Sequence, residues 1–149
     1  MSTDELTQYL HQHIPMSQHM GVRVRAAAPD AVTLAAPLAP NINHRETVFG
    51  GSASAVALLA AWTLLYVRLR AESINARVVV QYNTIDYDRP ITGDFTATAA
   101  LADAAAWRKF LEMLRRRGRA RIAVGVALYC NGEKVGALAG DFVALASGT

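Results

Sequence analysis

The chain has 149 residues, 52% of them apolar and 18% charged, which indicates one globular domain over residues 1–149 and excludes a disordered protein. Its single cysteine, Cys130, excludes an intrachain disulfide and a cysteine-based zinc site. The net charge of +3 is mildly basic and favours an acidic partner.

The first residues predict a helix and two short strands. Thr3–His13 has a helical pattern that Pro15 ends, and the strands Gly21–Arg25 and Val32–Pro37 flank a turn at Pro29-Asp30. The acidic N-terminal residues do not resemble a secretory signal, so we expect a cytoplasmic protein.

A long apolar helix is predicted next. Asn41–Val48 is polar and irregular, and the helix begins at Gly50 or Ser52 and ends near Arg70. Its apolar stretch, Phe49–Val67, approaches the roughly 20 residues that cross a membrane. Small residues in its first turns, many alanines and strands on either side favour the buried centre of a soluble fold instead.

The second half predicts four strands with a helix between the second and the third. Arg77–Tyr87 and Phe95–Leu101 are rich in β-formers, and Ala104–Arg117 is an amphipathic helix. Two final strands form a hairpin around Asn131-Gly132, a type I′ turn signal.

The hairpin strands have one face of branched residues and one of very small residues. The small residues, such as Ala123, Gly125, Gly136 and Gly140, leave room for a thick element, so we expect the apolar helix to pack there. One antiparallel sheet wrapped around one long central apolar helix is an α+β architecture.

A polar motif leads into the apolar helix and resembles the active-site loop of hotdog-fold thioesterases. The segment Arg89–Phe95 also resembles the link between that family's third and fourth strands. The motif is similar to that of the YiiD C-terminal subfamily and consists of Asn41, Asn43, Thr47, Phe49, Gly50, Gly51 and Ser52.

This resemblance implies an acyl-thioester enzyme. Members of the subfamily are described as thioesterases, and some decarboxylate malonyl-acyl carrier protein to supply the acetyl primer of fatty-acid synthesis. It also implies a homodimer, or a dimer of dimers, with active sites across the subunit interface. The substrate would be carried on the phosphopantetheine of acyl carrier protein or of coenzyme A, so we expect no metal and no other cofactor.

The start of the apolar helix is the expected catalytic centre. Gly50 and Gly51 allow a ligand close to the backbone, where free N–H groups and the helix dipole stabilise a thioester oxygen that gains charge. The alternative is that these glycines only permit tight packing. We expect the Asn43 amide to contact the thioester, or else to form an Asx turn, a role that Asn41 is better placed to fill.

Five more residues of the motif region are candidates for a role in the site. Ser52 and Thr47 would cap the helix or contact ligand. His44 and Glu46 are the nearby groups able to act as general bases, although an exposed loop position explains His44 as well. Phe49 is expected to contact substrate.

The helix carries no carboxylate where many hotdog thioesterases have one. No Asp or Glu lies between Glu46 and Glu72. Hydrolysis needs an activated water, whereas decarboxylation of a malonyl thioester needs only a stabilised enolate and a poorly solvated carboxylate. The sequence therefore favours malonyl-carrier decarboxylation, with a thioesterase and a non-catalytic acyl-binding dimer as alternatives.

A dense basic region spans the amphipathic helix Ala104–Arg117 and the strand after it, with Arg115, Arg116 and Arg117 at its centre. It is either a solvated face or a docking surface for an acidic acyl carrier protein. The region lacks interleaved aromatic residues, which ranks nucleic acid last. Elsewhere we expect His11 to be structural or exposed, Asp141 to form an ion pair and Cys130 to fill an apolar space.

Overall fold

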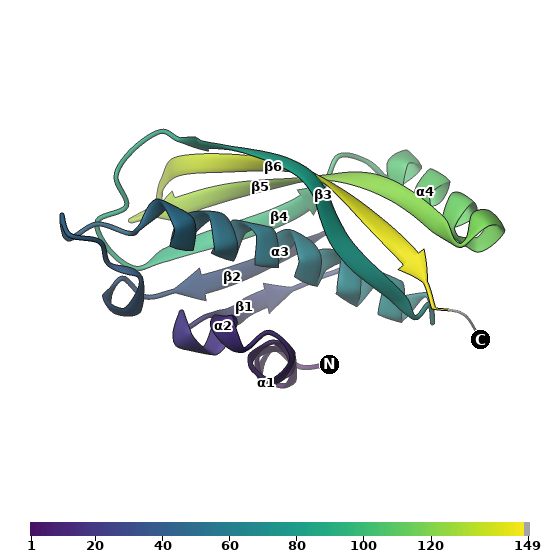
Figure 1. Cartoon of the computed structure of the whole chain (residues 1–149), viewed down its shortest axis with the longest axis horizontal. Coiled ribbons are helices and arrows are strands. Elements are labelled where there is room, and N and C mark those ends of the chain that lie inside the picture. The colour runs from purple at the N-terminus through teal and green to yellow at the C-terminus, as the bar shows by residue number, and fades with distance from the viewer. Residues whose placement is uncertain (148–149) are drawn as a thin grey trace.

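The computed structural model describes residues 1–147 and shows one six-stranded antiparallel sheet curving around a 22-residue helix, α3 (Figure 1). The strand order is β1-β2-β4-β5-β6-β3. This is the predicted α+β hotdog arrangement. The elements are α1 (Thr3–His13), α2 (Pro15–His19), β1 (Arg23–Ala27), β2 (Ala31–Ala36), a 3-10 turn (Ala39–Asn41), α3 (Gly50–Ala71), β3 (Ala76–Tyr87), β4 (Phe95–Leu101), α4 (Ala104–Arg117), β5 (Arg119–Cys130) and β6 (Glu133–Ala146).

Helix α3 is the centre of the core. By length and composition it could cross a membrane, but 56% of its most apolar window is buried, and it packs along the sheet against β2 to β6. Its alanines let the sheet approach the helix backbone, and its branched residues fill the space between. The buried residues of α3 are Ala53, Val56, Ala57, Leu59, Ala60, Ala61, Thr63, Leu64, Leu65 and Leu69.

The expectation that the helix packs on the small face of β5 is wrong. Burial alternates along β5, and the buried side is the branched one, which includes Ile122 and Val126. Ala123 and Gly125 face outward and are exposed. Because a row of branched side chains covers more apolar area than alanines do, burying that row contributes the larger stabilisation.

Two boundaries near the N-terminus differ from the prediction. Pro15 follows the end of α1, as expected, but it also occupies the first position of α2, where its missing N–H costs nothing. Gly21 adopts a positive φ of 69° in the turn after α2, so β1 begins at Arg23 and not at Gly21.

Strand β3 forms one edge of the sheet. It pairs only with β6, and a bulge interrupts the register between Val80 and Tyr82. Large apolar side chains remain exposed along it, namely Val79, Val80, Tyr82 and Tyr87.

Helix α4 lies at the C-terminal end of α3. The Arg68 guanidinium lies 4.5 Å from the ring centroid of the buried Trp107, and the Arg115 guanidinium contacts the Glu72 carboxylate at 3.2 Å. Gly118 ends α4 in the left-handed conformation, with φ of 71°.

Candidate functional site

The loop before α3 is anchored by Asn41. This residue is 2% exposed, and its Nδ2 donates to the carbonyls of Met20 and Pro37, each at 2.8 Å. Its own carbonyl accepts from the N–H of Phe49 at 2.8 Å. Asn41 thus ties the last residue before α3 to the end of β2.

Asn43 braces the next part of the loop. Its Oδ1 accepts from the N–H groups of Arg45 at 2.8 Å and Thr47 at 3.1 Å, and its Nδ2 donates to the Thr47 hydroxyl at 2.9 Å. Glu46 completes the turn with a positive φ of 65°. The Asx turn is therefore made by Asn43, and its assignment to Asn41 is wrong. One Nδ2 hydrogen of Asn43 is left for a ligand, because a primary amide has two.

The start of α3 offers free backbone donors. Phe49 precedes the helix without a side-chain cap, and the N–H groups of Ser52 and Ala53 donate to its carbonyl. The amides of Gly50 and Gly51 have no acceptor within residues 1–147. Ser52 is the third helical residue and does not cap the helix, contrary to one of its two interpretations.

Two aromatic rings flank these amides. The Phe49 ring, 59% exposed, folds over Gly51 so closely that a Cβ there would collide with its Cε2. The Tyr87 hydroxyl, at the end of β3, donates to the Gly50 carbonyl at 3.0 Å. Its ring lies 3.5 Å from where a Gly50 Cβ would be. Only Gly51 lies too close to a neighbour for a side chain, since the Tyr87 ring is at ordinary contact distance from Gly50. The Tyr87 contact was not predicted from the sequence.

An open apolar groove of about 260 Å³ begins one turn into α3 and contains no charged group. Leu58 lies in it, within the part of α3 that contains no Asp or Glu. The groove is lined by Ile14, Met16, Met20, Ala55, Leu58, Leu59, Trp62, Val80 and Phe142.

The two candidate bases are exposed on the loop. His44 and Glu46 form no side-chain hydrogen bond or ion pair with any described residue. A general base is normally held in place by a hydrogen bond of its own, and neither side chain has one here.

The arginines of the basic region have different surroundings: one forms an ion pair, and others line a groove. Arg115 pairs with Glu72. Arg117, together with Arg119 and Arg121 of β5, lines a groove of about 680 Å³ that Gln81, Met113, Ala120 and Val143 complete. Arg116 is exposed on α4 and does not line this groove.

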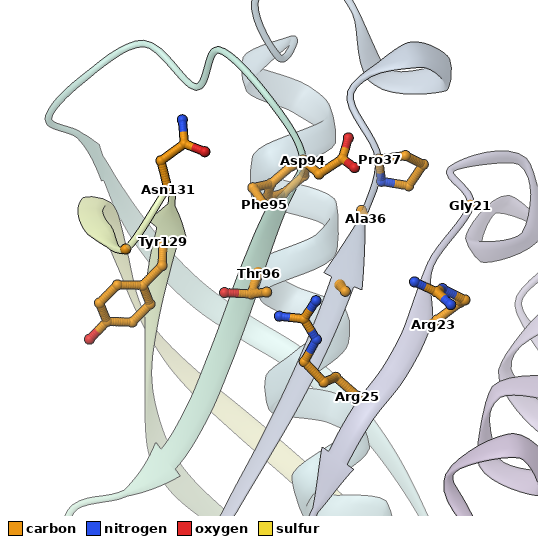
Figure 2. A pocket seen from close by; sticks show the side chains of 12 residues that line it. Gly21, Arg23, Arg25, Ala36, Pro37, Asp94, Phe95, Thr96, Tyr129 and Asn131 are labelled. Atoms are coloured by element: carbon orange, nitrogen blue, oxygen red, sulfur yellow. The ribbon is translucent and has the colours of Figure 1, made fainter.

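A second polar cavity, of about 380 Å³, lies on the outer face of the sheet at the end where β2 stops (Figure 2). Arg23 and Arg25 of β1 line it, and Figure 2 shows Arg25 extending across β2 toward Thr96. Their spacing of two residues along a strand is the signal that could have placed both on one face.

The remaining sequence candidates have structural roles. His11 contacts the Val22 carbonyl through Nε2 at 2.7 Å, and Cys130 is buried. Asp141 is partly buried and forms no ion pair with the residues that the structure describes, so the expected pair is not found.

The sequence and the structure are both similar to those of known proteins. The family described as "Putative thioesterase (yiiD_Cterm)" matches residues 3–146. A protein of unknown function from Chlorobaculum tepidum TLS is 29% identical, with a TM-score of 0.92 over 97% of this chain and 94% of its own.

Two solved thioesterase structures are also similar. The "putative thioesterase" from Shewanella oneidensis is 25% identical, with a TM-score of 0.85 over 96% of each chain. A thioesterase from Haemophilus influenzae, 13% identical with a TM-score of 0.79 over 98% of this chain and 92% of its own, shares the fold.

Proposed function

Because this chain belongs to the YiiD C-terminal family of hotdog thioesterases, we propose that it processes acyl thioesters at the start of α3 and decarboxylates malonyl-acyl carrier protein to acetyl-acyl carrier protein. The observation that supports this reaction most is the pair of free amides at Gly50 and Gly51, together with a groove without an acid or a base that begins one turn further along α3.

The proposed reaction needs no base. The bond between the malonyl carboxylate carbon and the α-carbon breaks, CO₂ leaves, and the electron pair forms an enolate whose charge lies on the thioester oxygen. The Gly50 and Gly51 amides donate to that oxygen, which the positive end of the helix dipole also stabilises. The α-carbon then takes a proton from water, which gives the acetyl thioester.

The apolar groove supports the same reaction. A carboxylate that enters it loses water without gaining an ion pair, which destabilises the anion relative to neutral CO₂. Asn43 then has two functions, since it holds the loop and presents its remaining amide hydrogen.

Thioester hydrolysis is the second candidate, and the family description favours it. It would use His44 or Glu46 to activate water, and both side chains lie on the loop beside the helix start. Their exposure makes them poorly protected bases, which is why we rank hydrolysis second.

We further propose that the active form is a homodimer that pairs two β3 edges. The free edge of β3 exposes backbone donors and acceptors and four large apolar side chains. Such an edge is a template for pairing with another strand. The apolar groove includes Val80 of this strand, so a partner there would also enclose the acyl group.

The test is to incubate purified protein with malonyl-acyl carrier protein and to weigh the carrier by mass spectrometry. Decarboxylation predicts a carrier lighter by one CO₂ that remains acylated. Free carrier thiol without acetyl-carrier would mean hydrolysis. Binding of the malonyl-carrier without formation of either product would mean that the protein is a non-catalytic acyl-binding dimer.

A further inference from the structure

The basic groove lies far from the helix start of its own subunit. Arg115 pairs with Glu72, the residue that ends α3, and Arg117 follows within one turn. The 22 residues of α3 separate this end from Gly50 by about 33 Å. A substrate held at the arginine end of the groove, by Arg117 and Arg119, is therefore badly placed for the site of the same chain, whereas Gln81 at the other end lies six residues before Tyr87 on β3.

In the proposed dimer, the groove of one subunit lies closer to the helix start of the other. Two β3 strands related by a two-fold axis run antiparallel, so the Ala76 end of one meets the Tyr87 end of the other. Tyr87 hydrogen-bonds to the Gly50 carbonyl and therefore marks the helix start. The helix start of the partner then lies beside the Ala76 end of β3.

The groove arginines are close to that same end. Arg77 aligns with Leu145 of β6, which aligns with Arg119, and Val79 aligns through Val143 with Arg121. Three strand spacings of about 4.8 Å place Arg119 about 15 Å from β3 of the partner. The helix start of the partner lies beyond its β3 by the length of the Tyr87 side chain, and it is still nearer than the roughly 33 Å that α3 spans within one subunit.

The charge around the groove fits an acidic protein better than a small anion. Besides the three groove arginines, Lys109 is exposed on α4 one turn before Met113 of the groove lining, and Glu112 is the one acid of this helix. The positive surface thus spans two elements, which is more than one phosphate requires, and complementary charge over such an area speeds and orients protein docking.

We propose that this groove, lined by Arg117, Arg119 and Arg121, docks the acidic face of acyl carrier protein and delivers its thioester to the active site of the partner subunit. The inference rests on the proposed function, because it takes the carrier-bound thioester as the substrate. It goes further by naming the surface of this chain that docks the carrier and by assigning docking to the subunit opposite the active site.

The first test compares two charge reversals. Arg119→Glu/Arg121→Glu alters the groove, and Arg23→Glu/Arg25→Glu makes the same charge change in the other outer-face cavity, at the helix-start end (Figure 2). We expect the groove variant to raise KM for malonyl-acyl carrier protein at least tenfold, with kcat retained and with malonyl-pantetheine turned over normally. The control pair should change KM less than about twofold. Equal effects, or a larger effect of the control pair, would overturn the proposal.

Mixed dimers test the opposite-subunit arrangement. One protomer carries the Arg119→Glu/Arg121→Glu change and the other Gly51→Leu, and two affinity tags isolate the heterodimer. If the groove of one subunit serves the active site of the other, the intact site of the Arg119→Glu/Arg121→Glu protomer is served by the intact groove of the Gly51→Leu protomer. The heterodimer then keeps about half of wild-type activity. Activity at the background of the two parent homodimers would mean docking within one subunit and would refute the inference.

Fluorescence anisotropy of labelled holo-carrier protein separates this proposal from the proposed reaction. Tight binding that the groove variant loses and the control pair keeps supports docking even if no CO₂ is released. Decarboxylation by a wild-type protein that does not bind the carrier, and that prefers malonyl-coenzyme A, would overturn docking while leaving the reaction intact.

Discussion

Gly51 is the residue where the proposed chemistry is most sensitive to a single methyl group. A Cβ at this position collides with the Phe49 ring, which must then move from its place over the helix start. We predict that Gly51→Ala lowers kcat for malonyl-carrier decarboxylation at least tenfold, because the added methyl group and the displaced ring obstruct the approach of the thioester oxygen to the Gly50 and Gly51 amides. The change is measured by steady-state kinetics.

Gly125 provides the matched control, because a Cβ there meets nothing within 4 Å. Gly125→Ala should leave kcat unchanged. Comparable losses in both variants would show that the close approach at Gly51 has no catalytic meaning.

Asn43 braces the loop and, in the proposed reaction, also donates to the substrate, and two substitutions separate these functions. Asn43→Asp keeps the acceptor for the Arg45 and Thr47 amides but removes the amide donor. Asn43→Ala removes both and should cost about 1–2 kcal/mol of unfolding free energy as well as activity. We expect the Asp variant to remain as stable as wild type while losing turnover, as measured by thermal melting and kinetics. A fully active Asp variant would leave Asn43 a purely structural residue.

At this scale the sequence identified the loop but not its hydrogen bonds. Asn41 and Asn43 have the same side chain two positions apart, and only the fold determines which one is buried against Met20 and Pro37. The role of Tyr87 was equally invisible, because its contact with Gly50 spans 37 residues of sequence.

At the scale of elements, the pairing of β3 with β6 requires a residue without a side chain at position 136, which is Gly136. An added Cβ would lie 2.6 Å from the Asp86 carbonyl oxygen of the neighbouring strand, a backbone atom that cannot rotate away. We predict that Gly136→Ala destabilises the protein by about 1–3 kcal/mol. Urea denaturation measures this change, and Gly125→Ala, on the adjacent strand, should be within error of wild type. A Gly136→Ala protein as stable as wild type would contradict the register.

Helices and strands were predicted well wherever a local pattern defines them. The bounds of α1, β4 and α4 agree with the prediction, since each is defined by periodicity and flanking turn residues. We predicted wrongly which face of β5 packs on the helix. Branched and small apolar residues alternate along this strand, so the alternation alone does not show which face is buried. Only the neighbours of the strand decide which one is buried.

At the scale of the whole molecule, we predict that dimer formation depends on the free edge of β3. Val80 and Tyr82 lie at the middle of this strand, so in a symmetric pair they lie near their own copies. We predict that Val80→Lys/Tyr82→Lys yields a folded monomer with little activity, because like charges oppose each other across the new pair. Light scattering coupled to size exclusion measures the mass.

Tyr129→Lys is the control, since Tyr129 is also an exposed aromatic residue but lies on β5. It should remain dimeric. A Val80→Lys/Tyr82→Lys protein that is still a dimer would place the interface elsewhere and would remove the basis for docking across subunits.

Strand order could not be read from local patterns at all. Strand β3 follows α3 in the chain but pairs with β6, and this pairing joins residues up to about seventy positions apart, such as Ala76 and Ala146. The order of the strands was not predicted, and it became visible only in three dimensions, as did the basic groove between α4 and β5.

The central claim is that the start of α3 releases CO₂ from a malonyl thioester without a general base. The most direct measurement is the rate of CO₂ release from malonyl-acyl carrier protein by wild type and by His44→Ala/Glu46→Ala. We predict that the two rates agree within about twofold, because no proton is removed in the step that breaks the carbon–carbon bond. A double variant slower by about a hundredfold, or a wild-type protein that yields free thiol and no CO₂, would contradict the account and favour base-assisted hydrolysis.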